Sequence, residues 1–320
     1  MNELAKRFLN GDVRALSRAI TVIEQGRPEA QELLEELASE RPGDLAPTVG
    51  LTGAPGAGKS TLTSALIGAA RRAGRTVAVL AVDPSSPYSG GALLGDRLRM
   101  SEFILDPGVF VRSMSARGQL GGLSPRAAEA VWLLRAFGFD EVIVESVGAG
   151  QSEHGLAALA DTTVVVLTPG AGDSIQLEKA GIVEIADVFA INKADLPGAE
   201  AFARAVKAMQ SIGPRRVWTP PVVRTIALAD DSHVSDLWEA IQGHREHLAA
   251  HGPSITAAAL VDRVATTVAE QARIWAERQS RLTSAELTSD PQLLIARLLG
   301  HLRLSEDLDP ITPPVPEVRR

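Results

Sequence analysis

The sequence predicts an α/β fold with a mostly parallel central sheet that is flanked by helices. From residue 46 to residue 252, short runs of β-branched and apolar residues alternate with stretches of helical periodicity. The runs are almost continuously apolar, which is typical of parallel strands buried on both faces. A glycine-rich turn follows the first run directly and leads into a helical stretch. The expected strands occupy residues 47–53, 76–82, 109–114, 140–146, 162–168, 187–193 and 220–228.

Residues 1–45 are expected to form a helical extension in front of this domain. Apolar residues recur at helical spacing from Val13 to Ile23, and Asp12 stands before them in a position that suits an N-cap. Pro28 then opens a second apolar run with the same kind of spacing. Helices are therefore expected before the first strand.

Residues 253–308 are expected to form a second helical region, and residues 309–320 a disordered tail. Apolar residues from Val261 to Leu282 fall near a seven-residue spacing. This seam either packs on its own domain or forms the interface of a homodimer, and the residues leave both interpretations open. The tail is rich in proline, which disfavours a packed structure.

The composition excludes several classes of protein. The chain of 320 residues has no cysteine, which excludes disulfides, iron–sulfur clusters and thiol nucleophiles. Its net charge is −7 and no Lys/Arg run exceeds two residues, so we expect neither a nucleic-acid nor a membrane partner. No apolar run approaches the ~18 residues of a membrane span, and the first residues lack the basic and apolar regions of a secretion signal. A cytoplasmic location is expected.

The segment GAPGAGKST at residues 53–61 matches the phosphate-loop pattern G-x-x-x-x-G-K-[ST]. Its glycines let the backbone wrap closely enough for successive N–H groups to point at phosphate oxygens, at the positive end of the following helix. Lys59 supplies a mobile charge for the β- and γ-phosphates, and the Ser60 hydroxyl can reach Mg²⁺. The segment therefore predicts a site for a nucleoside triphosphate. Its expected nucleotide-binding residues are Gly53, Ala54, Pro55, Gly56, Ala57, Gly58, Lys59, Ser60 and Thr61.

The base of this nucleotide is expected to be guanine. The segment NKAD, with Asn192, Lys193 and Asp195, follows an expected strand at the edge where nucleotide sites lie in such sheets. The Asp195 carboxylate can accept both N–H groups of the Watson–Crick edge of guanine, whereas adenine would leave it poorly paired. Asn192 is expected to steady the loop and face N7, and the stem of Lys193 is expected to lie over the ring.

Three acidic residues follow expected strands of the same sheet and are candidates for binding Mg²⁺. They are Asp83, Asp96 and Glu145. Mg²⁺ prefers octahedral oxygen ligation and keeps several waters, so one or two carboxylates suffice beside Ser60 and phosphate oxygens. For Asp83 and Asp96, the alternative is a cap or turn.

Glu145 and Gly148 have the spacing of the D-x-x-G segment of GTPases, with Glu in place of Asp. The N–H group of Gly148 would bind the γ-phosphate, and the loop from this glycine onward could relax when that phosphate leaves. Gln151 is the candidate for placing the attacking water. The expected catalytic residues are Lys59, Glu145 and Gln151.

Hydrolysis also needs positive charge against the charge that develops on the phosphate. Arg97, Arg99 and Arg112 either supply it or lie solvated at the surface, and the second interpretation is the simpler one for each.

Several sequence strings resemble those of one known family. Residues 77–100 read VAVLAVDPSSPYSGGALLGDRLRM, residues 143–153 read IVESVGAGQSE, and residues 169–176 read PGAGDSIQ. Together with NKAD, these strings resemble the MeaB/MMAA-type GTPases, also called the ArgK family, over about residues 10–250. The resemblance implies a P-loop fold and the activity of metallochaperones of adenosylcobalamin-dependent acyl-CoA mutases. In that activity, GTP hydrolysis is coupled to loading and protecting the mutase.

The resemblance also implies roles for particular residues. The phosphate and Mg²⁺ residues of the family fall on Lys59, Ser60, Asp83, Asp96 and Glu145. A loop that relays the nucleotide state to the mutase falls on residues 170–181, where Asp173, Gln176 and Lys179 match the usual form. Ser174 and Leu177 depart from that form, in place of Glu and Gly.

The last base-binding segment of the family, commonly Ser-Ala-Leu, is Ile226-Ala227-Leu228 in this chain. A hydroxyl is therefore missing, but backbone N–H groups at Ala227 and Leu228 can still reach the guanine oxygen. The implied ligands are Mg²⁺ and GTP or GDP, whereas adenosylcobalamin belongs to the partner. The implied assembly is a homodimer that acts on methylmalonyl-CoA mutase or a related mutase.

Two other classes share this kind of fold. A nickel- or zinc-inserting GTPase usually carries Cys/His ligands, and six scattered histidines without cysteine argue against it. A P-loop kinase would need an acceptor pocket, which nothing outside the nucleotide segments indicates.

Overall fold

The computed structural model describes residues 1–41, 45–83, 101–103, 105–115, 126–146, 152–170, 182–210, 217–227 and 232–252. The chain divides into two compact units, Met1–Ser254 and Ile255–Arg320, and all described residues belong to the first. The expected heptad seam from Val261 to Leu282 and the expected tail lie outside the described residues.

Seven strands form one sheet, as the apolar runs predict. They are β1 (Thr48–Gly53), β2 (Val77–Asp83), β3 (Val109–Ser115), β4 (Glu141–Glu145), β5 (Thr162–Leu167), β6 (Val188–Ile191) and β7 (Val222–Arg224). Their order is β3-β2-β4-β1-β5-β6-β7, and all six strand pairings are parallel. The predicted parallel α/β fold is therefore confirmed. Strand β4 lies between β1 and β2. The strands β2, β3 and β4 therefore lie on one side of β1, and the later strands β5, β6 and β7 lie on the other.

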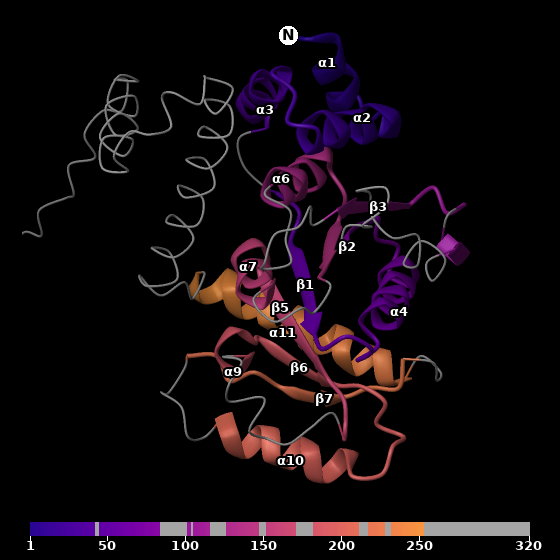
Figure 1. Ribbon diagram of the computed structural model, residues 1–320, viewed down its shortest axis with the longest axis vertical. Coiled ribbons are helices and arrows are strands. Elements are labelled where there is room, and N and C mark those ends of the chain that lie inside the picture. Colours follow the sequence, from indigo (N-terminus) through magenta and orange to yellow (C-terminus); the bar gives the residue numbers. More distant parts are fainter. Residues whose placement is uncertain are drawn as a thin grey trace, which may run out of the picture. The chain divides into compact units, whose positions relative to one another are not determined.

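One part of the sheet is covered by the N-terminal helices together with α6. Helices α1 (Glu3–Leu9), α2 (Val13–Glu24) and α3 (Glu29–Glu40) precede β1, and α6 (Ala127–Phe137) precedes β4. Figure 1 shows α6 lying between these three helices and the strands β2 and β3. Apolar residues of all four helices share one core with β2, β3 and β4. The N-terminal extension is thus packed onto the domain through α6.

The predicted cap of α2 is confirmed. The Asp12 carboxylate accepts a hydrogen bond from the backbone N–H of Arg14 at 2.8 Å, which satisfies one of the free donors of the first turn. Leu16 and Ile23 on the apolar face are fully buried. Val13 shares their spacing but is 47% exposed, because it stands at the first position of the helix, beyond the packed face.

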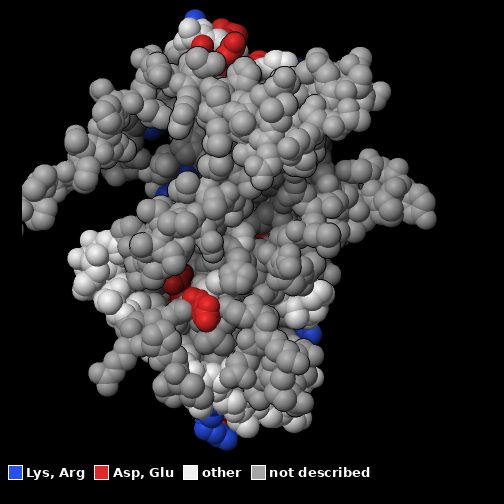
Figure 2. All heavy atoms as spheres, turned by 60° about the vertical axis from the view of Figure 1, so that its left-hand side comes forward, with Lys and Arg blue, Asp and Glu red and all other residues white. Residues whose placement is uncertain are grey.

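The outer side of α3 is acidic. Its exposed residues include Glu29, Glu32, Glu35 and Glu40. Acidic side chains gather over the N-terminal helices at the top of Figure 2. The negative charge of the chain is therefore partly concentrated on this extension.

The two faces of β5 contact different helices. Val164 and Val166 belong to a core with α4 (Lys59–Arg72) and α11 (Ser232–His251). Val165 and Leu167 belong to a core with α10, which starts at Ala199 and ends at Gln210. Since successive side chains of a strand point to opposite faces, α10 covers the face opposite α11.

Two short helices complete the described fold. They are α7 (Ser152–Leu159), which packs on β1, and α9 (Ile182–Ile185), which precedes β6. A 3-10 turn covers Ser101–Phe103. None of the helices in the described ranges combines the length and the apolar character that a bilayer crossing requires.

Candidate functional site

The phosphate loop connects the carboxyl end of β1 to the start of α4, at the centre of the sheet. Gly53 has φ 140° and Gly58 has φ 95°, which are backbone angles that residues with a Cβ rarely adopt. A Cβ at Gly53 would lie 2.1 Å from the Val166 carbonyl oxygen, and a Cβ at Gly58 would lie 2.2 Å from the Asn192 side-chain nitrogen. Close packing against β5 and against the segment NKAD at residues 192–195, called the base segment here, therefore requires glycine at both positions.

Lys59 lies folded over its own loop. Its Nζ donates hydrogen bonds to the carbonyl oxygens of Gly53 at 2.9 Å and Ala54 at 3.1 Å. The side chain is buried although it carries a charge, and the two carbonyls offset part of the lost hydration. The ammonium group is thus held against the phosphate loop, which leads from β1 into α4.

Glu145 reaches from β4 to the first two turns of α4. The Ser60 hydroxyl donates to Glu145 Oε1 at 2.5 Å, and the Thr63 hydroxyl donates to Glu145 Oε2 at 2.9 Å. The glutamate is only 4% exposed, and both hydroxyls are buried as well. The structure therefore brings together two of the residues predicted to bind Mg²⁺, Ser60 and Glu145. Sequence reasoning missed Thr63, although a hydroxyl residue three positions after Ser60 lies on the same face of a helix.

Asn192 connects the base segment to the phosphate loop and to the chain after β7. Its Nδ2 donates to the Ala57 carbonyl oxygen at 2.8 Å. Its Oδ1 accepts from the Thr225 hydroxyl at 3.2 Å and from the Ala227 N–H at 3.3 Å. Asn192 is 2% exposed, so it is a buried link between three segments. Thr225 is a second residue of this site that sequence reasoning missed.

Lys193 and Asp195 follow this link. Lys193 has φ 55°, and its Nζ donates to the Gly56 carbonyl oxygen at 2.9 Å. Asp195 is exposed in the turn that follows. Lys193 therefore lies against the phosphate loop, while the Asp195 carboxylate remains open to solvent.

Other predicted site residues are only partly described. Asp83 is the last residue of β2, but its side chain lies outside the described part. Beyond the described residues lie Asp96, Arg97, Arg99, Gly148, Gln151, Asp173, Gln176, Lys179 and Leu228.

Arg112 does not face the phosphate loop. Its Nη2 lies 2.8 Å from Glu24 Oε2 and 3.3 Å from the Thr21 hydroxyl, so it pairs with α2. Phe110 and Met114, two positions away on the same strand, also contact the core of the N-terminal helices. The period of two along a strand therefore directs Arg112 away from α4, and neither a charge donor nor a freely solvated arginine describes it.

The parallel sheet, the phosphate loop between β1 and α4, and the base segment after β6 define a P-loop GTPase. The chain belongs to the family of methylmalonyl Co-A mutase-associated GTPase MeaB, whose model matches residues 16–280. The resemblance to MeaB-type GTPases is thereby confirmed.

Known proteins resemble the chain over most of its length. A Pyrococcus horikoshii protein named as a GTPase is 40% identical over 319 residues, which are 97% of this chain and 95% of the relative. The methylmalonic aciduria type A homolog, mitochondrial, of Mus musculus is 35% identical over 269 residues, 79% of this chain and 65% of the relative. The crystal structure of a LAO/AO transport system kinase matches with a TM-score of 0.65 and 26% identity, and the match covers 95% of this chain and 99% of that one.

Proposed function

We propose that the protein is a Mg²⁺-dependent GTPase that acts as a chaperone of an adenosylcobalamin-dependent acyl-CoA mutase. The partner is methylmalonyl-CoA mutase or a related mutase, and GTP binding and hydrolysis are coupled to loading and protecting its cofactor. The family description, which names methylmalonyl Co-A mutase, supports this partner. The observation that carries the nucleotide part is the convergence of Lys59, Ser60, Glu145 and Asn192 around one loop.

GTP binding uses groups that the phosphate loop already holds in place. The loop from Gly53 to Thr61 wraps the phosphates, and Lys59 exchanges the carbonyls of its own loop for phosphate oxygens. Asp195 accepts the two N–H groups of guanine, and backbone N–H groups at Ala227 and Leu228 face the guanine oxygen. Asn192 keeps the base segment and the phosphate loop at a fixed separation.

The residues present fit Mg²⁺. The Ser60 hydroxyl and Glu145 Oε1 converge at 2.5 Å beside the phosphate loop, and both are hard oxygen donors of the kind that Mg²⁺ prefers. Asp83 and Asp96 are further candidate ligands. Phosphate oxygens and water can complete the octahedral coordination of Mg²⁺, so few protein ligands are needed. When bound, Mg²⁺ neutralises charge on the phosphates.

The remaining roles fall to segments around this site. Gln151 places the attacking water and Gly148 binds the γ-phosphate, so that loss of this phosphate releases their loop. Asp173, Gln176 and Lys179 pass that change to the mutase. The assembly is a cytoplasmic homodimer.

The proposal is tested with the full chain and a purified apo-mutase. GTP with Mg²⁺ should yield inorganic phosphate, ATP should not, and Lys59→Ala should abolish turnover while exposed Lys207→Ala should not. Size-exclusion chromatography with the mutase should give complexes of different size with GDP and with a non-hydrolysable GTP analogue. Active GTPase without any mutase complex would reject the chaperone role. Transfer of the γ-phosphate to an acceptor would indicate a kinase instead.

A further inference from the structure

We propose that Thr63 is the positioning residue that aims the Glu145 carboxylate at the Mg²⁺ site. It binds one oxygen of this carboxylate so that the other stays beside Ser60. The inference rests on the proposed function, because it assigns a role within the same nucleotide site. Thr63 itself is not a metal ligand in this proposal.

Two hydroxyls of one helix hold a single carboxylate. Ser60 and Thr63 are separated by three positions in α4, so their side chains project from the same face, one turn apart. Ser60 takes Oε1 at 2.5 Å and Thr63 takes Oε2 at 2.9 Å. With both oxygens engaged, the plane and the direction of the carboxylate are fixed. When a metal engages Ser60 and Oε1, the bond from Thr63 can remain in place.

The backbone of Glu145 is fixed independently of this contact. Glu145 ends β4 opposite Leu51 of β1 and Ala81 of β2. The following N–H, that of Ser146, continues the ladder to the Leu51 carbonyl oxygen at 3.1 Å. The freedom that remains in Glu145 is therefore in its side-chain torsions. Glutamate has one rotatable bond more than the aspartate of the usual D-x-x-G segment, and the Thr63 bond restrains that additional freedom.

The Thr63 hydroxyl is committed to this contact. A hydroxyl has a single O–H donor, and in helices threonine often donates it to a carbonyl of the preceding turn. Thr21 of α2 does so, with a 2.9 Å bond to the Ser17 carbonyl oxygen. Thr63 is fully buried and donates across to β4 instead. Its hydroxyl therefore serves the carboxylate and not its own helix.

The experiment uses Thr63→Val, which keeps the shape and removes the donor, and Thr63→Ser, which keeps the donor. Fluorescent GDP is bound to the full chain in EDTA, and Mg²⁺ is then titrated while the dissociation rate of the nucleotide is measured. For Thr63→Val we expect unchanged affinity in EDTA and a Mg²⁺ midpoint raised about tenfold, because a hydrogen bond to a charged group is lost. Thr63→Ser should stay within about twofold of the unmodified chain.

Thr21→Val is the matched control, since it removes a threonine hydroxyl from another helix of the same unit. Its Mg²⁺ midpoint should not move. An unmoved midpoint in Thr63→Val would overturn the inference, and so would equal shifts in the Val and Ser variants, which indicate a packing role. If Thr63→Val does not fold, comparison of Thr63→Ala with Thr63→Ser isolates the hydroxyl in the same way. If the unmodified chain binds no GDP, or binds it without any effect of Mg²⁺, the proposed function fails before Thr63 is at issue.

Discussion

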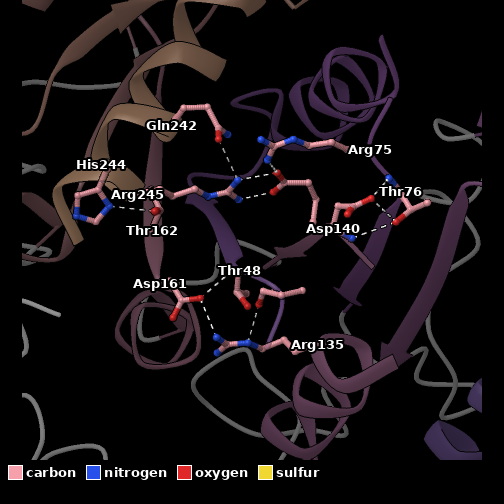
Figure 3. A network of polar contacts seen from close by, with 12 residues as sticks. Thr48, Arg75, Thr76, Arg135, Asp140, Asp161, Thr162, Gln242, His244 and Arg245 are labelled. Carbon is pink, nitrogen blue, oxygen red and sulfur yellow. Dashed lines mark hydrogen bonds and ion pairs between the residues drawn. The ribbon is translucent and has the colours of Figure 1, made fainter. Parts of the chain in front are cut away.

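The guanidinium group of Arg245 binds both carboxylate oxygens of Glu141, although Glu141 is only 1% exposed. Arg75 also donates to Glu141 Oε1, at 2.5 Å. Figure 3 shows the side chains of Arg245, from α11, and Arg75 extending toward the same place. Glu141 begins β4, so this contact lies at the edge of the sheet opposite the phosphate loop. The buried Glu141 carboxylate thus links α11, through Arg245, and the segment after α4, through Arg75, to strand β4.

The first prediction concerns this buried pair. Arg245→Met should lower the free energy of unfolding by about 3 kcal/mol, because among the described residues it leaves the buried Glu141 carboxylate with Arg75 as its one charged partner. Arg204→Met removes an exposed pair with Glu200 and should change it by less than about 0.5 kcal/mol. Urea unfolding followed by circular dichroism measures both. Equal small effects would show that Glu141 does not depend on Arg245.

The second prediction concerns the pH dependence of stability through His244. His244 is 2% exposed; its Nδ1 lies 2.9 Å from the Thr162 hydroxyl and its Nε2 3.5 Å from Asp187 Oδ1. Burial, and then the charges of His247 and Arg245, lower its pKa from 6.5 to about 4. Asp187 is the carboxylate that faces the ring at this distance.

The sign of the effect follows from proton binding. In the unfolded chain His244 binds a proton below about pH 6.5, whereas in the folded chain it does so only near pH 4. The unfolded state therefore binds more protons between these values, and stability falls as the pH drops from about 6.5 to about 4. At pH 5 the loss should be about 2 kcal/mol relative to pH 7.

Urea unfolding at pH 7 and pH 5 checks this prediction. His244→Asn removes the titrating ring, so the difference between the two pH values should shrink by most of that amount. His251→Asn, at an exposed position of the same helix, should leave the difference as it is. An undiminished pH dependence in His244→Asn contradicts the assignment.

The third prediction concerns the buried link at Asn192. Asn192→Ala frees the Ala57 carbonyl and the Thr225 hydroxyl at once, so the base segment is no longer fixed to the phosphate loop. We expect GDP affinity to fall by about tenfold or more, as for the loss of more than one buried hydrogen bond. Thr225→Val breaks only one of these bonds and should have a smaller effect. Calorimetric titration with GDP ranks the two variants, and the reverse order would sink the prediction.

The fourth prediction concerns the choice of base. Asp195→Asn exchanges an acceptor for a donor, which suits the additional carbonyl of xanthine in place of the amino group of guanine. Competition between GDP and xanthosine diphosphate should shift toward xanthine, with little change in stability because Asp195 is exposed. Asp236→Asn, at an exposed position of α11, is the control. Unchanged selectivity for guanine in Asp195→Asn would refute the assigned role.

Much of the fold could be predicted because burial on both faces leaves a local signature. Each of the seven apolar runs overlaps one strand, with β2 and β3 extending one residue beyond their runs, and the Asp12 cap lies where the pattern places it. The last strand was predicted too long: the run at 220–228 contains only Val222–Arg224. After Arg224, Thr225 turns toward Asn192, and this contact has no periodicity that a sequence could display.

The parts of the site formed by residues close together in the sequence were predictable. The contacts between side chains of different helices and strands were not. Residues from Gly53 to Ser60 are consecutive, so their spacing alone indicates phosphate binding. Thr63 and Arg112 gain their partners from other elements, α4 reaching β4 in one case and β3 reaching α2 in the other. The spacing of Thr63 from Ser60 places both on one helix face, but it does not show that Glu145 comes within reach. Nothing near Arg112 in the sequence distinguishes it from other arginines.

The sequence by itself determined the types of elements and the phosphate loop, because hydrophobic period, capping and glycine geometry are properties of neighbouring residues. Tertiary structure alone decided the strand order, with β4 inserted beside β1, and hence that Thr63 shares the Glu145 carboxylate with Ser60. It also decided that Glu141 is buried with Arg245, from residues 104 positions apart. The physical reason is that side-chain pairing and desolvation depend on which surfaces meet, and many strand orders bury the same apolar runs equally well.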